Sequence, residues 1–462
     1  MTTTRTLAEF AVGLSWTDLS DGTVSQLKKL LLDFLGVSLF AGRLPWTKSL
    51  LTVLTRLGGE PTSTILVGGT RTSAPVAAFA NGVLAHSADW DDSHIEAIVH
   101  PGAVVFPAAL AVAEAAGCSG RDFILATVSG YEVAIRLGLA VQPSHMERGF
   151  HGTATCGVFG ASVASARVFG LDAKAVAHAM GFAASFSGGL SQFFKWGSDI
   201  KRIHAGKSAH DGVLAALFAR EGLSAPPAPI EGERGFFDAY APVAAPERAT
   251  DGLGRRFCVD DVMVKALPIA AHIHGAVDAA FQLGRELGVP MEAITEVLVE
   301  IDPVIARNNA NPAPTDIQGA QMSLPFCVAC AMWCAGDRAR PLALADLEAG
   351  LSIAEVRSLA GKVRCVPTGS TVGERTTAAL DSSLDAGVTI RLHGGRVLSR
   401  RVTNPKGTRA NPFQWGDTVE KFRYCTEEVL SDTERRRLVE QVERLDELAS
   451  VRGLTRIRGN DR

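Results

Sequence analysis

The sequence predicts a mainly α protein, built from a large all-helical domain and a smaller α+β domain. At 462 residues the chain is too long for one ordinary core, which indicates two domains. Apolar residues recur at helical spacing through the first half, as in Leu27, Leu30, Leu31 and Phe34. Alternation of apolar and polar residues, which is typical of strands, is concentrated beyond residue 260.

The helical spacing starts in residues 23–40 and recurs in six later segments. Many of these segments are rich in Ala and Gly, which lets neighbouring helices approach closely. The six helices are expected at residues 75–87, 106–117, 121–140, 153–169, 173–186 and 207–222. Because few strand-like stretches lie among them, residues 1–264 are predicted to form the all-helical domain.

The pattern changes after Lys265. One helix is expected over residues 272–288, because Gly288 and Pro290 would end it. Strands are then expected at "ITEVLVEID" (294–302), "KVRCV" (362–366) and a hairpin over 388–402 with a Gly-Gly turn. We therefore assign residues 265–399 to the α+β domain.

The last part of the chain is helical again, as "SDTERRRLVEQVERLDELAS" (431–450) shows. We expect residues 400–462 to return to the all-helical domain.

The composition excludes several classes of protein. A net charge of -3 gives no reason to expect a nucleic-acid partner. No run of eighteen or more apolar residues suggests a membrane span, and the N-terminus lacks the apolar core of a secretory signal. The eight cysteines are sparse and lie largely in apolar segments, which fits buried thiols in a reducing compartment. We expect a cytoplasmic protein that does not bind membranes.

Four polar clusters interrupt the otherwise apolar helical sequence. They are "HSADWDDSHIEAIVHPG" (86–102), "GFHGTATCGVFG" (149–160), "GSDIKRIHAGKSAHDG" (197–212) and "KALPIAAHIHG" (265–275). Each alone has a structural explanation, since Asp91, Asp92 and Ser93 are good helix N-caps. Together they indicate a functional site, because apolar helices seldom carry so many Lys and His residues without use.

A metal site would need several closely spaced ligands, which His86 and Asp89 could only begin to supply. His272 and His274 stand two residues apart on an expected helix, so they point to different faces. We therefore expect no metal ion.

Acid–base chemistry on a carboxylate substrate suits these residues better. Removing a proton beside a carboxylate builds negative charge on an anion, and a water-poor pocket of cations stabilises that charge. His100 and His151 could carry protons near neutral pH, and Asp91 could orient a histidine. The cations available to bind carboxylates are Lys201, Arg202, Lys207 and Lys265.

The four clusters, in this order, resemble the MmgE/PrpD family, which includes 2-methylcitrate dehydratase, cis-aconitate decarboxylase and iminodisuccinate epimerase. The first matches the family's H-x-x-D-x-D-D-[ST] pattern followed by H-P-[SG], and the second its G-[FW]-H-x-T-x-x-x-G-x-F-[GA] stretch. The third matches G-[ST]-x-x-K-x-x-H-x-G-x-[AS]-A-x-x-G. "FQWGDTVEKFR" (413–423) resembles the closing N-P-x-x-x-x-[DE]-x-x-x-K-F element.

The resemblance covers nearly the whole chain and implies a helical domain made from both chain ends, with a smaller α+β lid. It also implies a homodimer, no cofactor and an active site between the domains. The expected catalytic residues are Asp89, His100, His151, Lys201 and Lys265. The expected substrate-binding residues are Asp92, Ser93, Arg202, His204, His272 and His274.

Two departures from the family pattern bear on the reaction. Decarboxylase-type members carry a His where this chain has Ala270, and a Tyr where it has Phe326. We therefore expect a cofactor-independent carbon–oxygen lyase that dehydrates a 2-methylcitrate- or citrate-like hydroxy acid. The alternatives are an epimerase of an iminodisuccinate-like dicarboxylate, a cis-aconitate-type decarboxylase, and a catalytically inactive dimeric binding protein.

Overall fold

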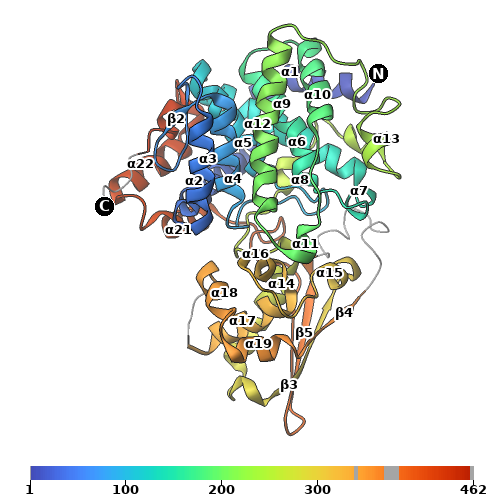
Figure 1. Ribbon diagram of the computed structural model, residues 1–462, viewed down its shortest axis with the longest axis vertical. Helices are drawn as coiled ribbons and strands as arrows, with labels where there is room; N and C mark the ends of the chain where they lie inside the picture. Colours follow the sequence, from blue (N-terminus) through green and yellow to red (C-terminus); the bar gives the residue numbers. More distant parts are fainter. Residues whose placement is uncertain (1, 338–341, 369–383, 458–462) are drawn as a thin grey trace. The chain divides into compact units, whose positions relative to one another are not determined.

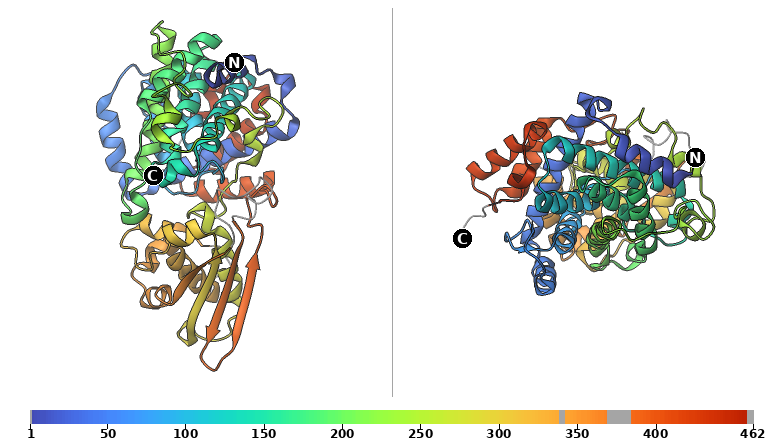
Figure 2. Two further views of the ribbon diagram at one scale, coloured as in Figure 1. Left: turned by 90° about the vertical axis from the view of Figure 1, so that its right-hand side faces the viewer. Right: turned by 90° about the horizontal axis from the view of Figure 1, so that it is seen from above.

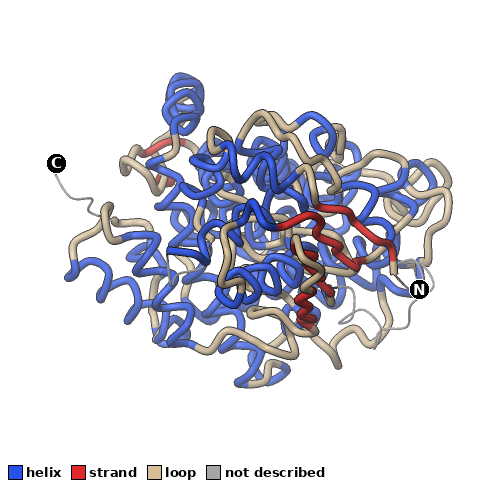
Figure 3. Tube along the Cα trace, turned by 90° about the horizontal axis from the view of Figure 1, so that it is seen from below, coloured by secondary structure: helices blue, strands red, loops and turns tan. Residues whose placement is uncertain are grey.

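The structure, a computed structural model, describes residues 2–337, 342–368 and 384–457. Helices hold 60% of the residues and strands 8%, which confirms a mainly α protein with a small sheet. Figure 3 shows how little of the chain is strand. Two compact units are formed. The helical unit comprises Met1–Ser191, Lys201–Val264 and Phe413–Arg462, and the mixed unit comprises Gln192–Ile200 and Lys265–Pro412.

The domain limits expected from the sequence, 264/265 and 399/400, stay predictions. The mixed unit as the structure has it extends to Pro412 and also contains the short segment Gln192–Ile200.

The helical unit is built from helices of very different lengths and one two-stranded hairpin (Figure 1). Several helices begin at a side-chain cap, such as Ser20, Ser119 and Asp172. The N-terminal part contains α1 (Thr3–Gly13), α2 (Asp21–Phe40), α3 (Pro45–Leu57), β1 (Ser63–Thr64), β2 (Arg71–Thr72), α4 (Ala74–His86), α5 (Gly102–Ala116) and α6 (Gly120–Val141). The rest contains α7 (Ser144–Glu147), α8 (Gly152–Thr155), α9 (Gly157–Val168), α10 (Ala173–Phe186), α12 (Ile200–Arg220), α13 (Phe236–Tyr240), α21 (Trp415–Thr426) and α22 (Asp432–Glu443).

The helices expected from periodicity are all present, with two differences that bear on the site. The helix expected over 153–169 is interrupted at Cys156, where α8 ends and α9 begins. The helix expected to start at residue 207 starts at Ile200, so Lys201 and His204 lie on its first turns.

Glycines bring α4 and α12 unusually close together. A Cβ added to Gly82 would lie 2.9 Å from the Cα of Gly206, and one added to Gly206 would lie 2.4 Å from the backbone oxygen of Phe79. Either atom would force the helices apart. This close approach sets the end of α4, at His86, beside the start of α12.

Among the described residues, α6 is the one helix long and apolar enough to cross a membrane by length and composition. Its most apolar 18-residue window is 100% buried inside the protein, as expected for a core helix. The cytoplasmic location stays a prediction.

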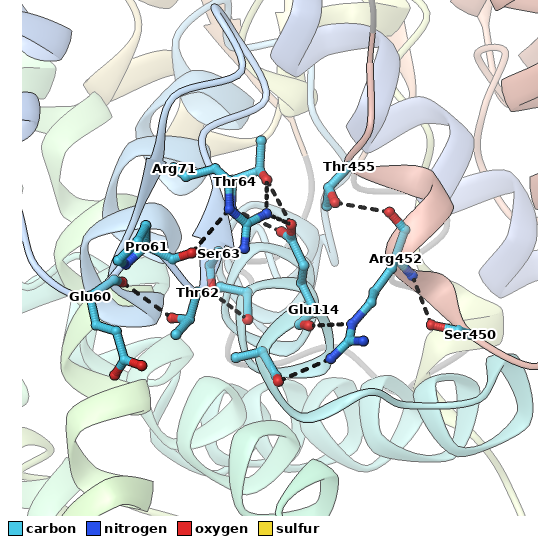
Figure 4. A network of polar contacts seen from close by, with 12 residues as sticks. Glu60, Pro61, Thr62, Ser63, Thr64, Arg71, Glu114, Ser450, Arg452 and Thr455 are labelled. Carbon is cyan, nitrogen blue, oxygen red and sulfur yellow. Dashed lines mark hydrogen bonds and ion pairs between the residues drawn. The ribbon is translucent and has the colours of Figure 1, made fainter.

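A network of polar contacts links the C-terminal segment around Arg452 to the N-terminal part of the helical unit (Figure 4). Arg452 donates from Nε to the backbone oxygen of Glu114, at the end of α5, over 2.8 Å. The buried carboxylate of Glu114 in turn accepts from Thr64 and Arg71 of the hairpin, each over 2.8 Å. A guanidinium at the C-terminus of a helix satisfies carbonyl groups that the helix leaves unpaired. This network helps α21 and α22, far along the chain, to pack on the N-terminal helices.

The mixed unit packs helices against a four-stranded sheet, and Figure 2 shows the strands side by side with helices along one face. Its helices are α11 (Phe193–Trp196), α14 (His274–Glu286), α15 (Pro303–Asn308), α16 (Ile317–Met322), α17 (Leu324–Asp337), α18 (Leu344–Gly350) and α19 (Ala354–Ala360). Its strands are β3 (Ile294–Ile301), β4 (Val363–Pro367), β5 (Ala386–Leu392) and β6 (Val397–Val402). Their order is β4-β3-β5-β6, with β4 parallel to β3 and the other pairs antiparallel.

The strands and the hairpin expected from the sequence are confirmed. Gly394 and Gly395 form the turn between β5 and β6, with φ of 84° and 85°, a region that favours glycine. The cysteines of the C-x-x-C sequence, Cys327 and Cys330, are buried with Cys334 in the core of the mixed unit. Core packing therefore explains them.

Candidate functional site

A group of titratable side chains meets inside the helical unit, where α4 and α12 approach each other. Residues from all three polar clusters of this unit contribute, since the rings of His86 and His151 lie 6.0 Å apart and Lys201 and His204 contact one ring each. We call them the buried cluster: His86, Asp89, Asp91, His100, His151, Lys201 and His204. His86 ends α4, His151 precedes α8, and Lys201 lies in the first turn of α12.

Lys201 lies at the centre of the buried cluster. Its Nζ atom donates to Asp89 Oδ1 over 2.7 Å and lies 3.1 Å from His86 Nε2. An ammonium group can only donate, so Nε2 of His86 accepts and Nδ1 carries the hydrogen. That hydrogen is donated to Asp91 Oδ2, 2.7 Å away. The four side chains therefore form a continuous hydrogen-bonded row from Asp91 to Asp89.

The tautomer of His100 is fixed by a backbone carbonyl. Nδ1 lies 2.7 Å from the backbone oxygen of Asp92, and because a carbonyl only accepts, Nδ1 carries the hydrogen. The lone pair of the neutral ring is then on Nε2, which makes that atom a proton acceptor. His100 is 14% exposed at its side chain, whereas His86 is fully buried. Asp91 Oδ2 lies 3.5 Å from His100 Nδ1 and so links His100 to His86.

His151 and His204 form a second pair, with 3.1 Å between their Nδ1 atoms. Burial, and then the neighbouring His204, lowers the pKa of His151 well below its usual value. Burial likewise lowers the pKa of His204 to about 4, and burial lowers the pKa of His86. These three rings are therefore neutral near pH 7, so none of them adds a positive charge to the site.

The side chains of two expected substrate-binding residues, Asp92 and Arg202, make contacts within the fold. Asp92 accepts from the Gly102 amide at the start of α5 over 2.9 Å and from the Tyr131 hydroxyl over 2.7 Å. Arg202 donates to the backbone oxygen of Ser87 over 3.1 Å, and its guanidinium lies 3.8 Å from the ring centre of Trp46. These contacts favour a structural role for both residues.

Ser93, a further expected substrate-binding residue, pairs its backbone with that of Met263 through two hydrogen bonds of 2.9 and 2.8 Å. The residue is 3% exposed. The three remaining expected residues, Lys265, His272 and His274, belong to the mixed unit, where Lys265 and His274 are buried. Their roles stay predictions.

His86 was missing from the residues expected in the site, although it contacts both Lys201 and Asp91. It ends an apolar helix, where a single histidine is commonly a packed core residue. The available signal was the spacing of His86 and Asp89, three residues apart, with Asp91 two residues further on.

Asp92 gives a pH-dependent prediction. Burial raises the pKa of Asp92 from 3.8 to about 8, partly offset by the Tyr131 hydrogen bond. The folded state then binds this proton more tightly, so stability falls as the pH rises through that window. Asp92→Asn preserves both contacts without a titrating group. The free energy of unfolding in urea should be measured at pH 5 and at pH 8. From the lower to the higher pH, the wild type should lose on the order of 2–4 kcal/mol more of this free energy than the variant does. Equal pH dependence of the two proteins would contradict this.

Four groups of the cluster also have the spacing of a metal site. The candidate ligand atoms of His86, Asp89, Asp91 and His100 lie within 4.8 Å of one another. The Lys201 ammonium already bonds two of these four side chains, so a second cation there would be repelled.

We accordingly predict that dialysis against a chelator leaves turnover unchanged. The measurement is the initial rate before and after dialysis, with metal content checked by mass spectrometry. Activity that disappears on dialysis and returns with added zinc or manganese would show that the cluster holds a metal.

Comparison with known proteins agrees with this architecture. The family model of the MmgE/PrpD N-terminal domain matches residues 5–249, and that of the MmgE/PrpD C-terminal domain matches residues 267–447. The chain therefore belongs to the MmgE/PrpD family, as its motifs predicted.

Several relatives carry the name of an enzyme. The chain is 28% identical to cis-aconitate decarboxylase of Homo sapiens, with 98% of this chain and 93% of the relative covered. It is 24% identical to cis-aconitate decarboxylase of Aspergillus terreus, with coverages of 97% and 94%. It is 25% identical to the cis-aconitate decarboxylase-like protein oryM of Aspergillus oryzae, with coverages of 97% and 95%.

Proposed function

We propose that this protein is a cofactor-independent lyase that removes a proton beside a carboxylate of a small di- or tricarboxylate. The favoured reaction is dehydration of a 2-methylcitrate- or citrate-like hydroxy acid. The observation that carries the proposal is the buried row of Asp91, His86, Lys201 and Asp89, with the ring of His100 beside it, 4.8 Å from the ring centre of His86.

In the proposed reaction, Nε2 of His100 takes the proton next to a carboxylate. The electrons of that C–H bond form the new C=C bond, and the C–O bond to the hydroxyl group breaks. Lys201 gives its proton to the departing hydroxide, so water leaves. Asp91, which contacts both His86 and His100, offers a route for the proton to return to Lys201.

The environment suits this chemistry. The negative charge that develops on an anionic substrate is stabilised most strongly by a fixed cation in a water-poor site. Lys201 is 3% exposed and is held at both sides by hydrogen bonds, so little reorganisation is needed when charge develops. Lys265, on the family motif, stays a predicted second cation for a substrate carboxylate.

Decarboxylation of a cis-aconitate-like substrate is the second candidate, and the names of the relatives favour it. Ala270, where decarboxylase-type members carry a His, argues against it. The presence of Phe326 in place of a Tyr is a weaker argument against decarboxylation than the sequence suggested, because the Phe326 ring lies in the core of the mixed unit. The Cζ atom is 3.2 Å from the position of a Cβ on Gly350. A hydroxyl at that ring tip would face α18.

Proton NMR in deuterated water tests the proposal on a panel of di- and tricarboxylates. Dehydration of a citrate-like acid gives the signal of a trisubstituted alkene with all carboxylates retained. Dehydration of a 2-methylcitrate-like acid gives an alkene without an alkene proton, and the methyl doublet becomes a singlet. Decarboxylation gives an alkene with loss of carbon dioxide, and epimerisation gives deuterium at the α-carbon without an alkene. No change in any substrate would favour a binding protein without catalytic activity.

The proposal includes the homodimer and the cytoplasmic location that the family resemblance implies. Sedimentation velocity at micromolar concentration tests the dimer, which would be absent if the protein sedimented as a 48.7 kDa species.

A further inference from the structure

We propose that Lys421, in the closing sequence element of α21, is a positioning residue that holds Asp89 and Asp91 in register with Lys201 and His86. The consequence for turnover rests on the proposed function. The contacts themselves do not, and they can be tested separately.

Lys421 reaches the loop of the buried cluster from a segment 331 residues away in sequence. Its Nζ donates to the backbone oxygen of Trp90 over 2.7 Å and pairs with Asp33 Oδ1 of α2 over 2.6 Å. Trp90 stands between Asp89 and Asp91. Asp33 and Lys421 are buried, and a hydrogen bond from a charged donor to a buried carbonyl is stronger than one between neutral groups.

The backbone at this point has to be held in place. Asp89 has a φ of 50°, in the left-handed region that an L-residue occupies at a cost unless its surroundings fix it. The Trp90 carbonyl belongs to the peptide that leads into Asp91. Rotation of this peptide would move Asp91 away from His86, and relaxation at Asp89 would break its bond to Lys201.

The ring of Trp90 is held by the same two helices. Phe40 of α2 and Tyr424 of α21 contact it edge-on, with ring centres 5.8 and 5.7 Å away. The Lys421 ammonium lies 5.0 Å from the ring centre, within the range of a cation–π contact. Trp90, between Asp89 and Asp91, is therefore held by three kinds of contact: the cation–π contact, the packing of its ring and the hydrogen bond to its carbonyl.

The neighbouring Phe422 explains why α21 can support the loop so closely. A Cβ added to Gly36 of α2 would lie 3.2 Å from the Phe422 ring, so the two helices meet where Gly36 leaves room. Figure 1 shows α21 beside α2. In the closing element, Phe422 therefore packs on α2, and the adjacent Lys421 reaches the loop that carries Trp90.

Lys421→Met removes the donor and keeps the length of the side chain. We expect kcat to fall by about 100-fold with little change in KM, because misplacing catalytic groups by about 1 Å costs that much. Amide hydrogen exchange of the loop, residues 87–95, should become faster, including at Ser93 and His94, whose amides are hydrogen bonded.

This variant leaves the Asp33 carboxylate buried without its cation, so instability alone could lower activity. The double variant Asp33→Asn/Lys421→Met removes both charges. Its resistance to urea should recover towards that of the wild type, whereas the low kcat and the fast exchange of residues 87–95 should persist.

Lys28→Met is the matched control. Lys28 also extends from α2 to the C-terminal segment, where its Nζ donates to the Glu443 carbonyl over 2.7 Å and to the Asp446 carboxylate. Neither partner contacts Trp90, so kcat and exchange of residues 87–95 should stay at wild-type values.

A double variant with wild-type kcat would overturn the positioning role, as would unchanged exchange of residues 87–95 in Lys421→Met. If the wild type turns over no carboxylate, the proposed function fails, and hydrogen exchange alone then decides whether Lys421 holds the loop.

Discussion

Lys201→Met is expected to lower turnover of the carboxylate substrate by about 10³–10⁴-fold, the largest effect on activity that we predict. The substitution removes the proton proposed for the leaving hydroxide and the fixed charge beside the substrate. It also removes the hydrogen bonds that Lys201 donates to His86 and Asp89. The measurement is kcat by alkene absorbance, with circular dichroism to check that the variant is folded.

Lys207→Met is the control for this prediction. The sequence also offered Lys207, on the same helix, as a cation for a carboxylate, but the structure engages it elsewhere. It bonds the Phe186 carbonyl and Asp211, each within 2.8 Å, and its side chain is 37% exposed. We expect its turnover to stay within about 3-fold of the wild type, since surface ion pairs contribute little. A Lys201→Met protein as active as this control would remove Lys201 from the mechanism.

Arg136→Met is expected to produce the largest loss of stability, about 3–5 kcal/mol. Arg136 is buried in α6, pairs with Glu132 over 2.8 Å and donates to the backbone oxygens of Asp251 and Arg256. Its removal leaves the buried Glu132 carboxylate without its cation, and the carbonyls of Asp251 and Arg256 without this donor. Burial already raises the pKa of Glu132, an effect that Arg136 opposes. The variant should therefore force Glu132 towards its neutral form.

The free energy of unfolding in urea checks this prediction, with a second ion pair as reference. Arg5 and Glu9 have the same i, i+4 spacing, but their side chains are 70% and 38% exposed. Arg5→Met should therefore change stability by less than about 0.5 kcal/mol. If both variants unfolded at the same urea concentration, burial would not explain the role of Arg136.

The fold could be predicted largely from the sequence, because apolar spacing reports which face of each element is buried. α12 shows where this method fails. Its first turns carry Lys201, Arg202 and His204 on buried positions, so the apolar pattern begins only later, near residue 207. Where a helix buries polar residues at a functional site, its apolar stripe is interrupted, so apolar spacing does not reveal that part of the helix.

The site could be predicted in part. His100, His151 and Lys201 were expected, and the structure brings them into one cluster. The partners of Asp92 and Arg202 could not be foreseen, because Tyr131 and Trp46 come from distant helices. Nor could the contact of Lys421 with Trp90, which depends on how the C-terminal helix packs on α2.

The central claim is that His100 takes the proton beside a carboxylate, and the rate at which the substrate loses this proton tests it most directly. His100→Asn can retain an N–H group for the Asp92 carbonyl while it removes Nε2. The rate at which the α-proton signal disappears as the alkene forms, followed by proton NMR in deuterated water, should fall by about 100-fold or more in this variant. Loss of the α-proton at the wild-type rate would contradict the account.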